Sequence, residues 1–489
     1  MNKYILAIDQ GTTSSRAIVF DKKGVQISCA QREVQCLYPH PGWVEADPIA
    51  IWVSVIDVIT EVMIKGRISQ KDIDSIGITN QRETTVVWDR ITGEPVYNAI
   101  VWQSRQSASI CDRFEKDKEL IHSKTGLLIN PYFSASKIRF ILDHIPDGQE
   151  RAEKGELMFG TIDSWIIYKL TNGNVHATDV SNASRTLLFN INEMKWDKEL
   201  CQMFNIPMNM LPTVKPSSYN YGKVLNTDIC ICGVAGDQQA ALFGQTCFET
   251  GESKNTYGTG CFMLLNTGEK PILSKKGLLT TVAWQIGDKV TYALEGSVFI
   301  GGAVVQWLRD EMKMIRKSSE SEELANEVES SNGVYIVPAF VGLGTPYWDD
   351  DTRGAVFGLT RGSNKNHFVR ASLESIAYQC KDVFEVMKKE TKCSLKSLKV
   401  DGGATANKYL MQFQSNILKT NIMLPTCLET TALGAAYLAG LCSGFYKGLD
   451  EIKSVHSYQA VYEPLMSDKE IDRHYKGWQK AVKAARMFK

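Results

Sequence analysis

The sequence predicts an α/β protein made of two similar halves, each a mixed β-sheet covered by helices. Short apolar stretches alternate along the chain with longer stretches whose apolar residues recur every three or four positions, which is typical of strands alternating with helices. The strand arrangement at residues 4–30 recurs near residue 255, close to the middle of the 489-residue chain. We therefore expect domains at residues 1–245 and 246–489, with a ligand cleft between them where loops from both sheets converge.

The first half opens with three predicted strands. Residues 4–8 form a short apolar strand, and a polar turn at residues 9–15 follows it. The alternation at Ala17 and Val19 indicates a second strand that ends in a hairpin turn, and residues 25–30 indicate a third. This unit places the polar turn at the end of a buried strand.

A helix follows these three strands. Asp47 is its predicted N-cap, because an aspartate side chain accepts hydrogen bonds from the first free backbone N–H groups, and Pro48 suits the first helical position. The apolar residues that mark it as a helix, at a spacing of three or four, are Trp52, Ile56, Ile59 and Met63.

The second half repeats the opening unit. A strand that ends near Tyr257 leads into the turn Gly258-Thr259-Gly260, and a strand at residues 261–265 follows. Two amphipathic helices are predicted further along, one marked by Phe368, Ser372, Ile376, Cys380, Val383 and Met387, the other by Leu410, Phe413 and Ile417.

The composition excludes several classes of protein. Lys+Arg and Asp+Glu are both 55, and this zero net charge argues against nucleic acid or an anionic membrane surface as a partner. The 12 cysteines are scattered and form no CxxC motif, so we expect reduced thiols in a cytoplasmic protein. The longest uncharged stretch, residues 430–446, contains three glycines and is too short to span a membrane, so we expect a buried small-residue helix there and no membrane insertion.

Three polar, glycine-containing loops could hold phosphate. Residues 9–16 combine Asp9, one glycine, four hydroxyl side chains and Arg16, and the other loops are residues 258–260 and 401–404. Glycine lets backbone N–H groups approach an anion, and Asp9 could hold Mg²⁺ through water. Each loop alone also fits an ordinary capped turn, but the three together predict a nucleotide clamp. A GxxxxGK[ST] motif is absent and no GxGxxG follows a strand, which argues against a P-loop kinase or a dinucleotide dehydrogenase.

A second group of residues suits the recognition and activation of hydroxyl groups. Arg82 offers donors and Glu83 offers acceptors, although the two also fit a surface ion pair after a strand. Asp237 lies where a predicted strand opens a helix, which suits a helix N-cap as well as a general base for an attacking hydroxyl. The aromatic residues that fit either the core or the walls of a small pocket are Trp102, Tyr132 and Phe262.

These segments resemble the FGGY family of carbohydrate kinases, in the actin-like ATPase superfamily, and within it the branch that acts on glycerol. The resemblance covers essentially the whole chain, and the block Asn80-Gln81-Arg82-Glu83-Thr84 is specific to the glycerol branch. The segments that carry the resemblance are residues 8–16, 77–84, 236–241, 256–262, 354–359 and 401–404.

The resemblance implies two actin-like (RNase H-like) α/β domains and ATP-dependent phosphorylation of glycerol to sn-glycerol 3-phosphate and ADP. It implies Mg²⁺ as cofactor, Asp237 as general base, and a homodimer or homotetramer. A kinase of the same fold for another polyol or a ketose, a non-kinase actin-like ATPase switch and a catalytically inactive relative remain alternatives.

The resemblance also implies roles for individual residues. Those of the glycerol pocket are Arg82, Glu83, Trp102, Tyr132, Asp237, Gln238 and Phe262, and Asp9 is implied at the metal. Those around the nucleotide are Thr12, Thr13, Ser14, Arg16, Thr259, Gly302, Gln306, Gly403 and Asn407. Residues beside the pocket that depart from the family's usual pattern are Ser104, Gln106 and Phe140.

Overall fold

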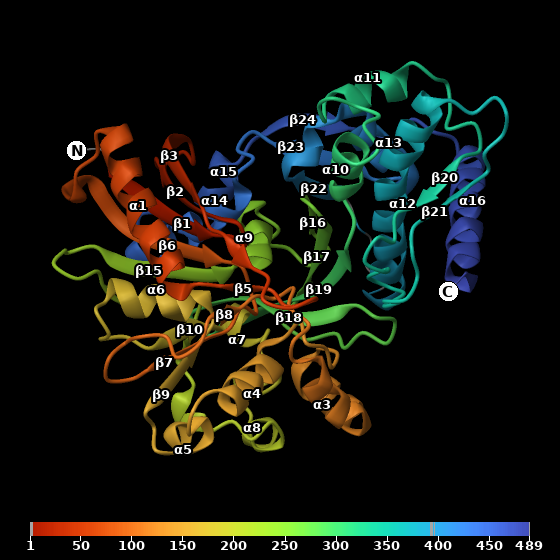
Figure 1. Cartoon of the computed structure of the whole chain (residues 1–489). Helices are drawn as coiled ribbons and strands as arrows, with labels where there is room; N and C mark the ends of the chain where they lie inside the picture. Colours follow the sequence, from red (N-terminus) through yellow and green to blue (C-terminus); the bar gives the residue numbers. More distant parts are fainter. Residues whose placement is uncertain (1–2, 392–394, 396, 489) are drawn as a thin grey trace.

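The computed structural model describes residues 3–391, 395 and 397–488, and its central feature is one long mixed β-sheet (Figure 1). The predicted α/β fold class is confirmed. From edge to edge the 13 strands are β24 (Tyr458–Tyr462), β23 (Asn421–Pro425), β22 (Ser397–Asp401), β16 (Ser253–Tyr257), β17 (Cys261–Gly268), β19 (Lys289–Val298), β18 (Leu279–Ile286), β14 (Ser218–Lys223), β15 (Cys230–Gly236), β6 (Ile73–Asn80), β1 (Tyr4–Gln10), β2 (Ser14–Phe20) and β3 (Gln26–Glu33).

The two halves of the sheet repeat one strand pattern. In the run β3-β2-β1-β6-β15-β14, successive pairs are antiparallel, antiparallel, parallel, parallel and antiparallel. The run β19-β17-β16-β22-β23-β24 follows the same sequence of pairings. The repeat predicted from the opening strands therefore extends through each half. A single pairing of Ser218 with Ile286 joins β14 to β18, so the two mixed sheets meet edge to edge.

The first turn is shorter than predicted. Strand β1 continues to Gln10 and β2 starts at Ser14, so Asp9 is the penultimate residue of a strand and only residues 11–13 form the turn. The reason is the ladder between the two strands, in which Asp9 pairs with Arg16 and Gln10 with Ser15. Polar residues are kept in the strand because backbone hydrogen bonds, and not side-chain polarity, decide where the pairing ends.

The first helix, α1 (Pro48–Gly66), is present and starts as predicted. The Asp47 side chain accepts a hydrogen bond from the Ile49 backbone N–H at 2.8 Å. Of the apolar residues that marked the helix, Ile56 is 38% exposed, because apolar residues occur on neighbouring stripes of this helix and only packing on β2 and β3 selects between them. The apolar side chains that α1 fully buries are Ile51, Val55, Val58 and Val62.

Much of the segment between β6 and β14 lies below the main sheet in Figure 1, while its helix α6 (Ile162–Leu170) packs on β6 and β15. This segment supplies several walls of the site described below. Its elements are β7 (Val86–Asp89), β8 (Ala99–Ile100), α2 (Ala108–Cys111), α3 (Lys118–Thr125), α4 (Ser134–His144), α5 (Gly148–Glu153), β9 (Leu157–Gly160), α6 (Ile162–Leu170), β10 (Ala177–Asp179), α7 (Val180–Ala183), β11 (Phe189–Asn190), β12 (Lys195–Trp196), α8 (Lys198–Met203) and β13 (Thr213–Lys215), while β4 (Cys36–Leu37) and β5 (Glu45–Ala46) precede α1.

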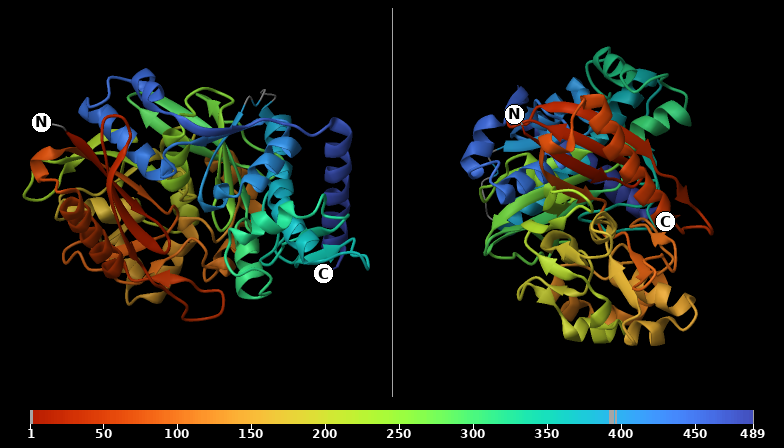
Figure 2. Two further views of the ribbon diagram at one scale, coloured as in Figure 1. Left: turned by 90° about the horizontal axis from the view of Figure 1, so that it is seen from above. Right: turned by 90° about the vertical axis from the view of Figure 1, so that its left-hand side faces the viewer.

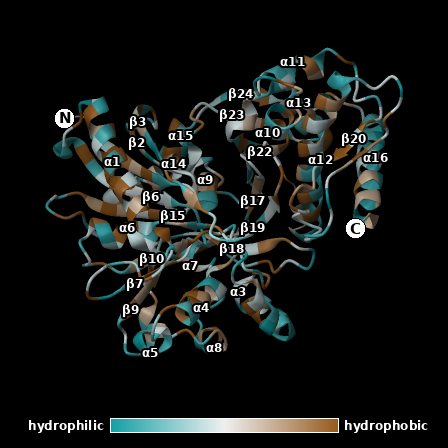
Figure 3. Cartoon of the chain, in the orientation of Figure 1, coloured by the Kyte–Doolittle hydropathy of each residue, from teal (hydrophilic) through white to brown (hydrophobic). Residues whose placement is uncertain are grey.

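Two predicted helices of the second half are present with their expected buried faces. The long helix α12 (Lys365–Thr391) buries Ile376 and Val383, and α13 (Lys408–Leu418) buries Leu410 and Ile417. Peripheral helices such as α3, α5 and α11 are largely hydrophilic (Figure 3). The remaining elements are α9 (Asp237–Gly244), α10 (Ala303–Asp310), α11 (Glu320–Asn326), β20 (Tyr335–Val337), β21 (Ala355–Phe357), α14 (Thr430–Ser443), α15 (Leu449–Val455) and α16 (Asp468–Met487).

Helices α9 and α14 cross between the two halves (Figures 1 and 2). The predicted buried small-residue helix is α14, and it packs on α9 and on β6 and β15 of the first half. A Cβ atom on Gly434 would lie 1.8 Å from the Ala240 carbonyl oxygen, and one on Gly244 would lie 2.0 Å from that of Thr430. Glycine is thus required for this backbone approach. In the part of the chain that is described, no helix is long and apolar enough to cross a membrane.

This contact yields a stability prediction. Gly434→Ala should lower the free energy of unfolding by about 1–3 kcal/mol, because its methyl group collides with rigid backbone. Chemical denaturation with tryptophan fluorescence would measure the change. Gly448→Ala is the matched control, since a Cβ atom on Gly448 would meet nothing within 4 Å and its backbone is extended, with a φ of 169°. Equal stability of both variants would contradict the proposed close packing of α9 and α14.

Candidate active site

The turn between β1 and β2 lies beside residues from distant parts of the chain. The Gly11 backbone N–H donates to the Ser14 carbonyl oxygen at 2.9 Å, which closes the turn. The Trp102 indole N–H donates to the Thr12 hydroxyl at 2.9 Å. Thr13 is exposed and Ser14 half-buried. The predicted phosphate loop therefore adjoins an aromatic residue predicted for the acceptor pocket.

Arg16 extends from the same hairpin towards the second half. Its guanidinium forms an ion pair with Glu429, just before α14, at 2.8 Å. Burial raises the pKa of Asp9 to about 7, Arg16 lowers it, and Asp237 and Glu429 raise it further. Asp9 and Asp237 therefore lie close enough to influence each other's charge.

The acidic groups at this site fit Mg²⁺ bound mainly through a nucleotide. Within the described ranges no group of three or more His, Cys, Asp or Glu side chains could hold a metal ion alone. Mg²⁺ typically uses one or two carboxylates, water and substrate phosphates. The partly buried carboxylate of Asp9 has a raised pKa because of desolvation, which a nearby cation would relieve, and Asp237 adds a second acidic group.

The predicted nucleotide loops of the second half meet each other. The backbone N–H groups of Gly301 and Ala303 donate to the Thr259 carbonyl oxygen at 2.8 and 3.1 Å. Gly402 has a φ of +92°, and a Cβ on it would lie 2.6 Å from the Tyr257 carbonyl oxygen. Three separate segments are thus held together at the ends of β16, β19 and β22. Thr259 and Gly403 are exposed within this cluster, and Gly302 is half-buried.

The two remaining nucleotide residues differ in their surroundings. The Asn407 side chain caps α13 by accepting from the Leu410 backbone N–H at 2.9 Å, and its amide donates to the Ser321 hydroxyl at 3.2 Å. Gln306 is exposed on α10. The side chain of Asn407 therefore already has a structural role, whereas that of Gln306 projects into solvent.

Arg82 and Glu83 are buried directly after β6, so a surface ion pair is excluded. They are 3% and 1% exposed, respectively. Glu83 has a φ of 60°, and this left-handed conformation turns the chain sharply after the strand. The Arg82 Nε atom lies 3.1 Å from a carboxylate oxygen of Asp237. The donor and acceptor predicted for hydroxyl recognition therefore adjoin the predicted base.

Sequence reasoning missed two charged partners of this pair. Glu295, in the middle of β19, accepts from Arg82 at 2.5 and 3.1 Å and from Arg185 at 3.1 Å. Arg185 also donates from Nε to Glu83 at 2.6 Å. Burial alone would raise the pKa of Glu295, but Arg185 and Arg82 outweigh it and hold this pKa at about 2. An acidic residue within the apolar stretch of β19 was the one available signal.

Two buried lysines were also missed. Lys137 donates to the backbone carbonyl oxygens of Glu83 and Tyr132 at 3.2 and 2.7 Å, and burial lowers its pKa to about 7. Lys254 donates to the side chains of Gln238 and, at 2.9 Å, Thr256. Burial lowers the pKa of Lys254 to about 8, although nearby acidic groups oppose this. These lysines secure the backbone and side chains that surround Arg82 and Asp237.

Three half-buried aromatic residues lie beside these polar groups. The ring centroid of Trp102 is 5.5 Å from that of Tyr132 and 6.5 Å from that of Phe262, in edge-to-face arrangements. Tyr132 also lies 5.7 Å from the Arg185 guanidinium. Because Phe262 belongs to β17, both halves contribute to this wall.

Asp237 is the first residue of α9 and does not cap it through its side chain. Its carboxylate accepts from the adjacent Gln238 backbone N–H at 2.7 Å, and the N-cap position, Gly236, makes no side-chain bond. The side chain of Asp237 is 31% exposed. A carboxylate that is oriented by Arg82 and still reachable by a ligand suits proton transfer.

The chain matches both domains of one enzyme family. The N-terminal domain of the FGGY family of carbohydrate kinases matches residues 4–244, and its C-terminal domain matches residues 253–442. The chain belongs to the FGGY family of carbohydrate kinases. The family predicted from the sequence is thus confirmed. The domain limits predicted above remain a prediction.

The FGGY relatives include proteins named glycerol kinase. Those of Halalkalibacterium halodurans and Listeria monocytogenes are 57% and 58% identical, with 100% of this chain and 99% of each relative covered. The structure of Plasmodium falciparum glycerol kinase with ADP has a TM-score of 0.93 and 39% identity, and covers 99% of this chain and 98% of that one. A gluconate kinase from Lactobacillus acidophilus has a TM-score of 0.89 at 22% identity over 100% of this chain and 98% of that one, which supports the fold alone.

The three departures from the usual FGGY pattern form internal contacts. The Ser104 hydroxyl donates to Gln106 at 2.7 Å, and the Gln106 amide donates to Glu45 at 3.1 Å. Phe140 stacks on His144 with ring centroids 3.8 Å apart. All three side chains are thus buried and have partners within the protein.

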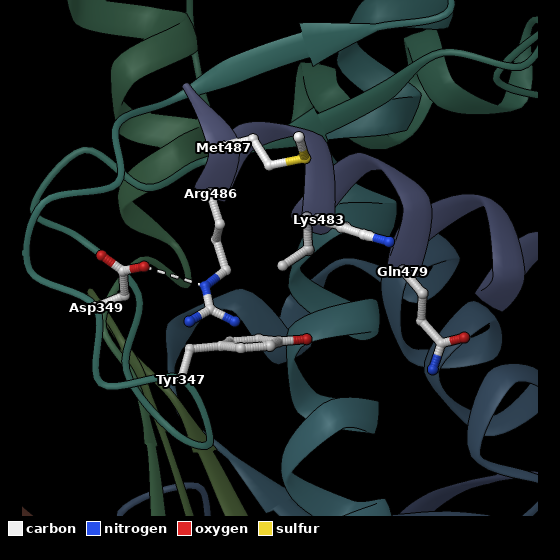
Figure 4. A pocket seen from close by; sticks show the side chains of 7 residues that line it. Tyr347, Asp349, Gln479, Lys483, Arg486 and Met487 are labelled. Carbon is white, nitrogen blue, oxygen red and sulfur yellow. Dashed lines mark hydrogen bonds and ion pairs between the residues drawn. The ribbon is translucent and has the colours of Figure 1, made fainter. Parts of the chain in front are cut away.

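A surface groove of about 500 Å³ lies elsewhere, between α16 and the segment that follows β20 (Figure 4). Arg486 pairs with Asp349 at 3.1 Å and lies over the Tyr347 ring. None of the predicted FGGY site residues lines this groove, whose lining is Tyr347, Asp349, Gln479, Val482, Lys483, Arg486 and Met487.

Proposed function

We propose that the chain is an ATP-dependent glycerol kinase that produces sn-glycerol 3-phosphate and ADP. The observation that carries this proposal is the joint burial of Arg82 and Glu83 beside Asp237, at the end of β6. Glycerol presents hydroxyl groups on a short carbon chain, and a selective site must pair them, because an unpaired buried polar group costs about 1–3 kcal/mol. The full-length identity to glycerol kinases supports the same activity.

Each side chain of the proposed glycerol pocket has a distinct task. Arg82 donates to glycerol hydroxyls and Glu83 accepts from them. Lys254 binds the side-chain oxygen of Gln238, which leaves the amide NH₂ group of Gln238 to donate to substrate. The aromatic side chains that cover the carbon side of glycerol are Trp102, Tyr132 and Phe262.

Phosphate transfer then follows an in-line displacement. A glycerol hydroxyl oxygen forms a bond to the γ-phosphorus of ATP, the bond from that phosphorus to the bridging oxygen breaks, and ADP departs. Asp237 accepts the hydroxyl proton, and Arg82 orients its carboxylate. Mg²⁺, held near Asp9, would neutralise phosphate charge when bound.

The residues proposed to bind the nucleotide come from both halves of the chain. Thr12, Thr13, Ser14 and Arg16 surround the transferred phosphate, next to Asp9. Backbone N–H groups and small residues let the nucleotide approach the second half closely. The residues that we assign to this second-half contact are Thr259, Gly302, Gln306, Gly403 and Asn407.

Measuring ADP release across a panel of acceptors tests the proposal. We expect kcat/KM for glycerol to exceed that for D-xylulose at least about 100-fold, because unmatched hydroxyls leave buried groups unpaired. A preference for xylulose or gluconate would assign the chain to another acceptor within the same fold. ADP release independent of any acceptor would instead support an ATPase switch.

Location and assembly remain predictions. The cysteines within the described ranges are free thiols, which suits the reducing cytoplasm proposed for this enzyme. We propose a homodimer or homotetramer, which light scattering of the purified protein would test.

A further inference from the structure

The acceptor pocket lies on a buried set of four charges that cancel each other. Arg82 and Arg185 carry positive charge, Glu83 and Glu295 carry negative charge, and all four are at most 3% exposed. Each carboxylate binds a guanidinium, at 2.5 Å for Arg82–Glu295 and 2.6 Å for Arg185–Glu83. A buried charge must be balanced locally, because an unpaired ion in a poorly solvated site is strongly unfavourable.

Two members of this set are completely buried. Arg185 and Glu295 are both 0% exposed, and Glu295 comes from β19 in the second half. One terminal nitrogen of Arg185, Nη1, is buried without a hydrogen-bond partner. Through its other nitrogens Arg185 binds both carboxylates of the set, Glu83 at 2.6 Å and Glu295 at 3.1 Å, and so places one positive charge between two negative ones.

We propose that Arg185 and Glu295 determine acceptor selectivity, by balancing Arg82 and Glu83 so that the pocket accepts uncharged polyols and rejects charged acceptors. The inference rests on the proposed glycerol kinase activity and adds the charge class of the acceptor. Other charged groups nearby are Asp237, beside Arg82, Lys254, which is influenced by Asp237, Arg82 and Glu295, and Lys137, which donates to the Glu83 carbonyl oxygen at 3.2 Å. Asp237 and Lys254 add one charge of each sign, and burial lowers the pKa of Lys137 to about 7, which reduces its positive charge near neutral pH.

Three variants alter the charge of the buried set in known steps. Glu295→Gln keeps the side-chain volume and removes one negative charge, so that the set becomes net positive. Arg185→Gln removes one positive charge, and the double variant restores the balance. The probes are D-glycerate as an anionic analogue and 2-amino-1,3-propanediol as a cationic one. Their inhibition constants are measured against glycerol phosphorylation, and the KM for glycerol itself is measured alongside.

We expect opposite shifts for the two charged probes. In Glu295→Gln the inhibition constant for glycerate should fall about tenfold and that for the aminodiol should rise. Arg185→Gln should reverse both shifts, and the double variant should return towards the wild-type ranking. If the variants bind all the ligands more weakly and to a similar extent, these residues only hold the pocket's shape. That result would overturn the proposal.

Two controls keep the test decisive. Glu374→Gln alters another buried carboxylate, which pairs with the half-buried Arg370 at 3.1 Å in the second half, and should leave the ranking unchanged. If the single variants do not fold, wild-type enzyme still provides a test, since glyceramide should inhibit at least about tenfold better than the equally shaped glycerate. Equal inhibition by both would overturn the charge proposal even though glycerol is phosphorylated. Failure of wild-type enzyme to phosphorylate glycerol would instead refute the proposed function.

Discussion

Replacing Asp237 by asparagine should lower kcat for glycerol phosphorylation about 10²–10⁴-fold, the usual contribution of a general base. The amide keeps the shape of the side chain but cannot accept the hydroxyl proton. ATP affinity should change little, because the proposed nucleotide contacts lie on other loops. Steady-state kinetics with glycerol and a direct ATP-binding titration would separate the two effects.

Asp197→Asn is the matched control for this variant. Asp197 also stands at a helix start, where its side chain accepts from the backbone N–H groups of Glu199 and Leu200. The Asp197→Asn substitution should lower the free energy of unfolding but leave kcat of the folded enzyme unchanged, since Asp197 lies outside the proposed site. Near wild-type turnover of Asp237→Asn would show that Asp237 is only part of a helix start.

Replacing Arg82 by alanine should raise KM for glycerol about 100-fold or more. Arg82 offers charge-assisted hydrogen bonds, each contributing about 1.5–3 kcal/mol, and every 1.4 kcal/mol changes an equilibrium tenfold. Loss of its bond to Asp237 should also reduce kcat. Any slow ATP hydrolysis without glycerol should persist, because that reaction does not use the acceptor pocket.

Arg139→Ala provides the comparison. Arg139 is also buried, at 7% exposure, and its guanidinium pairs with Asp143 at 2.8 Å and donates to the Asn205 carbonyl oxygen at 2.7 Å instead of binding the acceptor residues. It should lower stability without changing KM for glycerol. An unchanged glycerol KM in Arg82→Ala, with both variants folded, would remove Arg82 from the proposed pocket.

Several elements followed directly from local sequence. The Asp47-Pro48 start of α1, the buried small-residue helix α14 and the repeated hairpins were predicted because capping, side-chain size and strand alternation act over a few residues. The face of α1 that is buried did not follow from the spacing of its apolar residues. A helix with apolar residues on neighbouring stripes needs the packed strands to decide which stripe is buried.

In the candidate site too, some features followed from the sequence and others depended on the tertiary structure. The sequence determined the types of residue at the ends of β1, β6, β15 and β16, and these were sufficient to predict the family. The partners of those residues depended on tertiary structure, since Glu295 binds Arg82 from 213 positions away and Arg185 binds Glu83 from 102. A buried charge requires an opposite charge nearby in space, but nothing in its local sequence specifies where along the chain that charge lies. The charge balance of the acceptor pocket was therefore decided only when β6, β19 and the segment after α7 packed together.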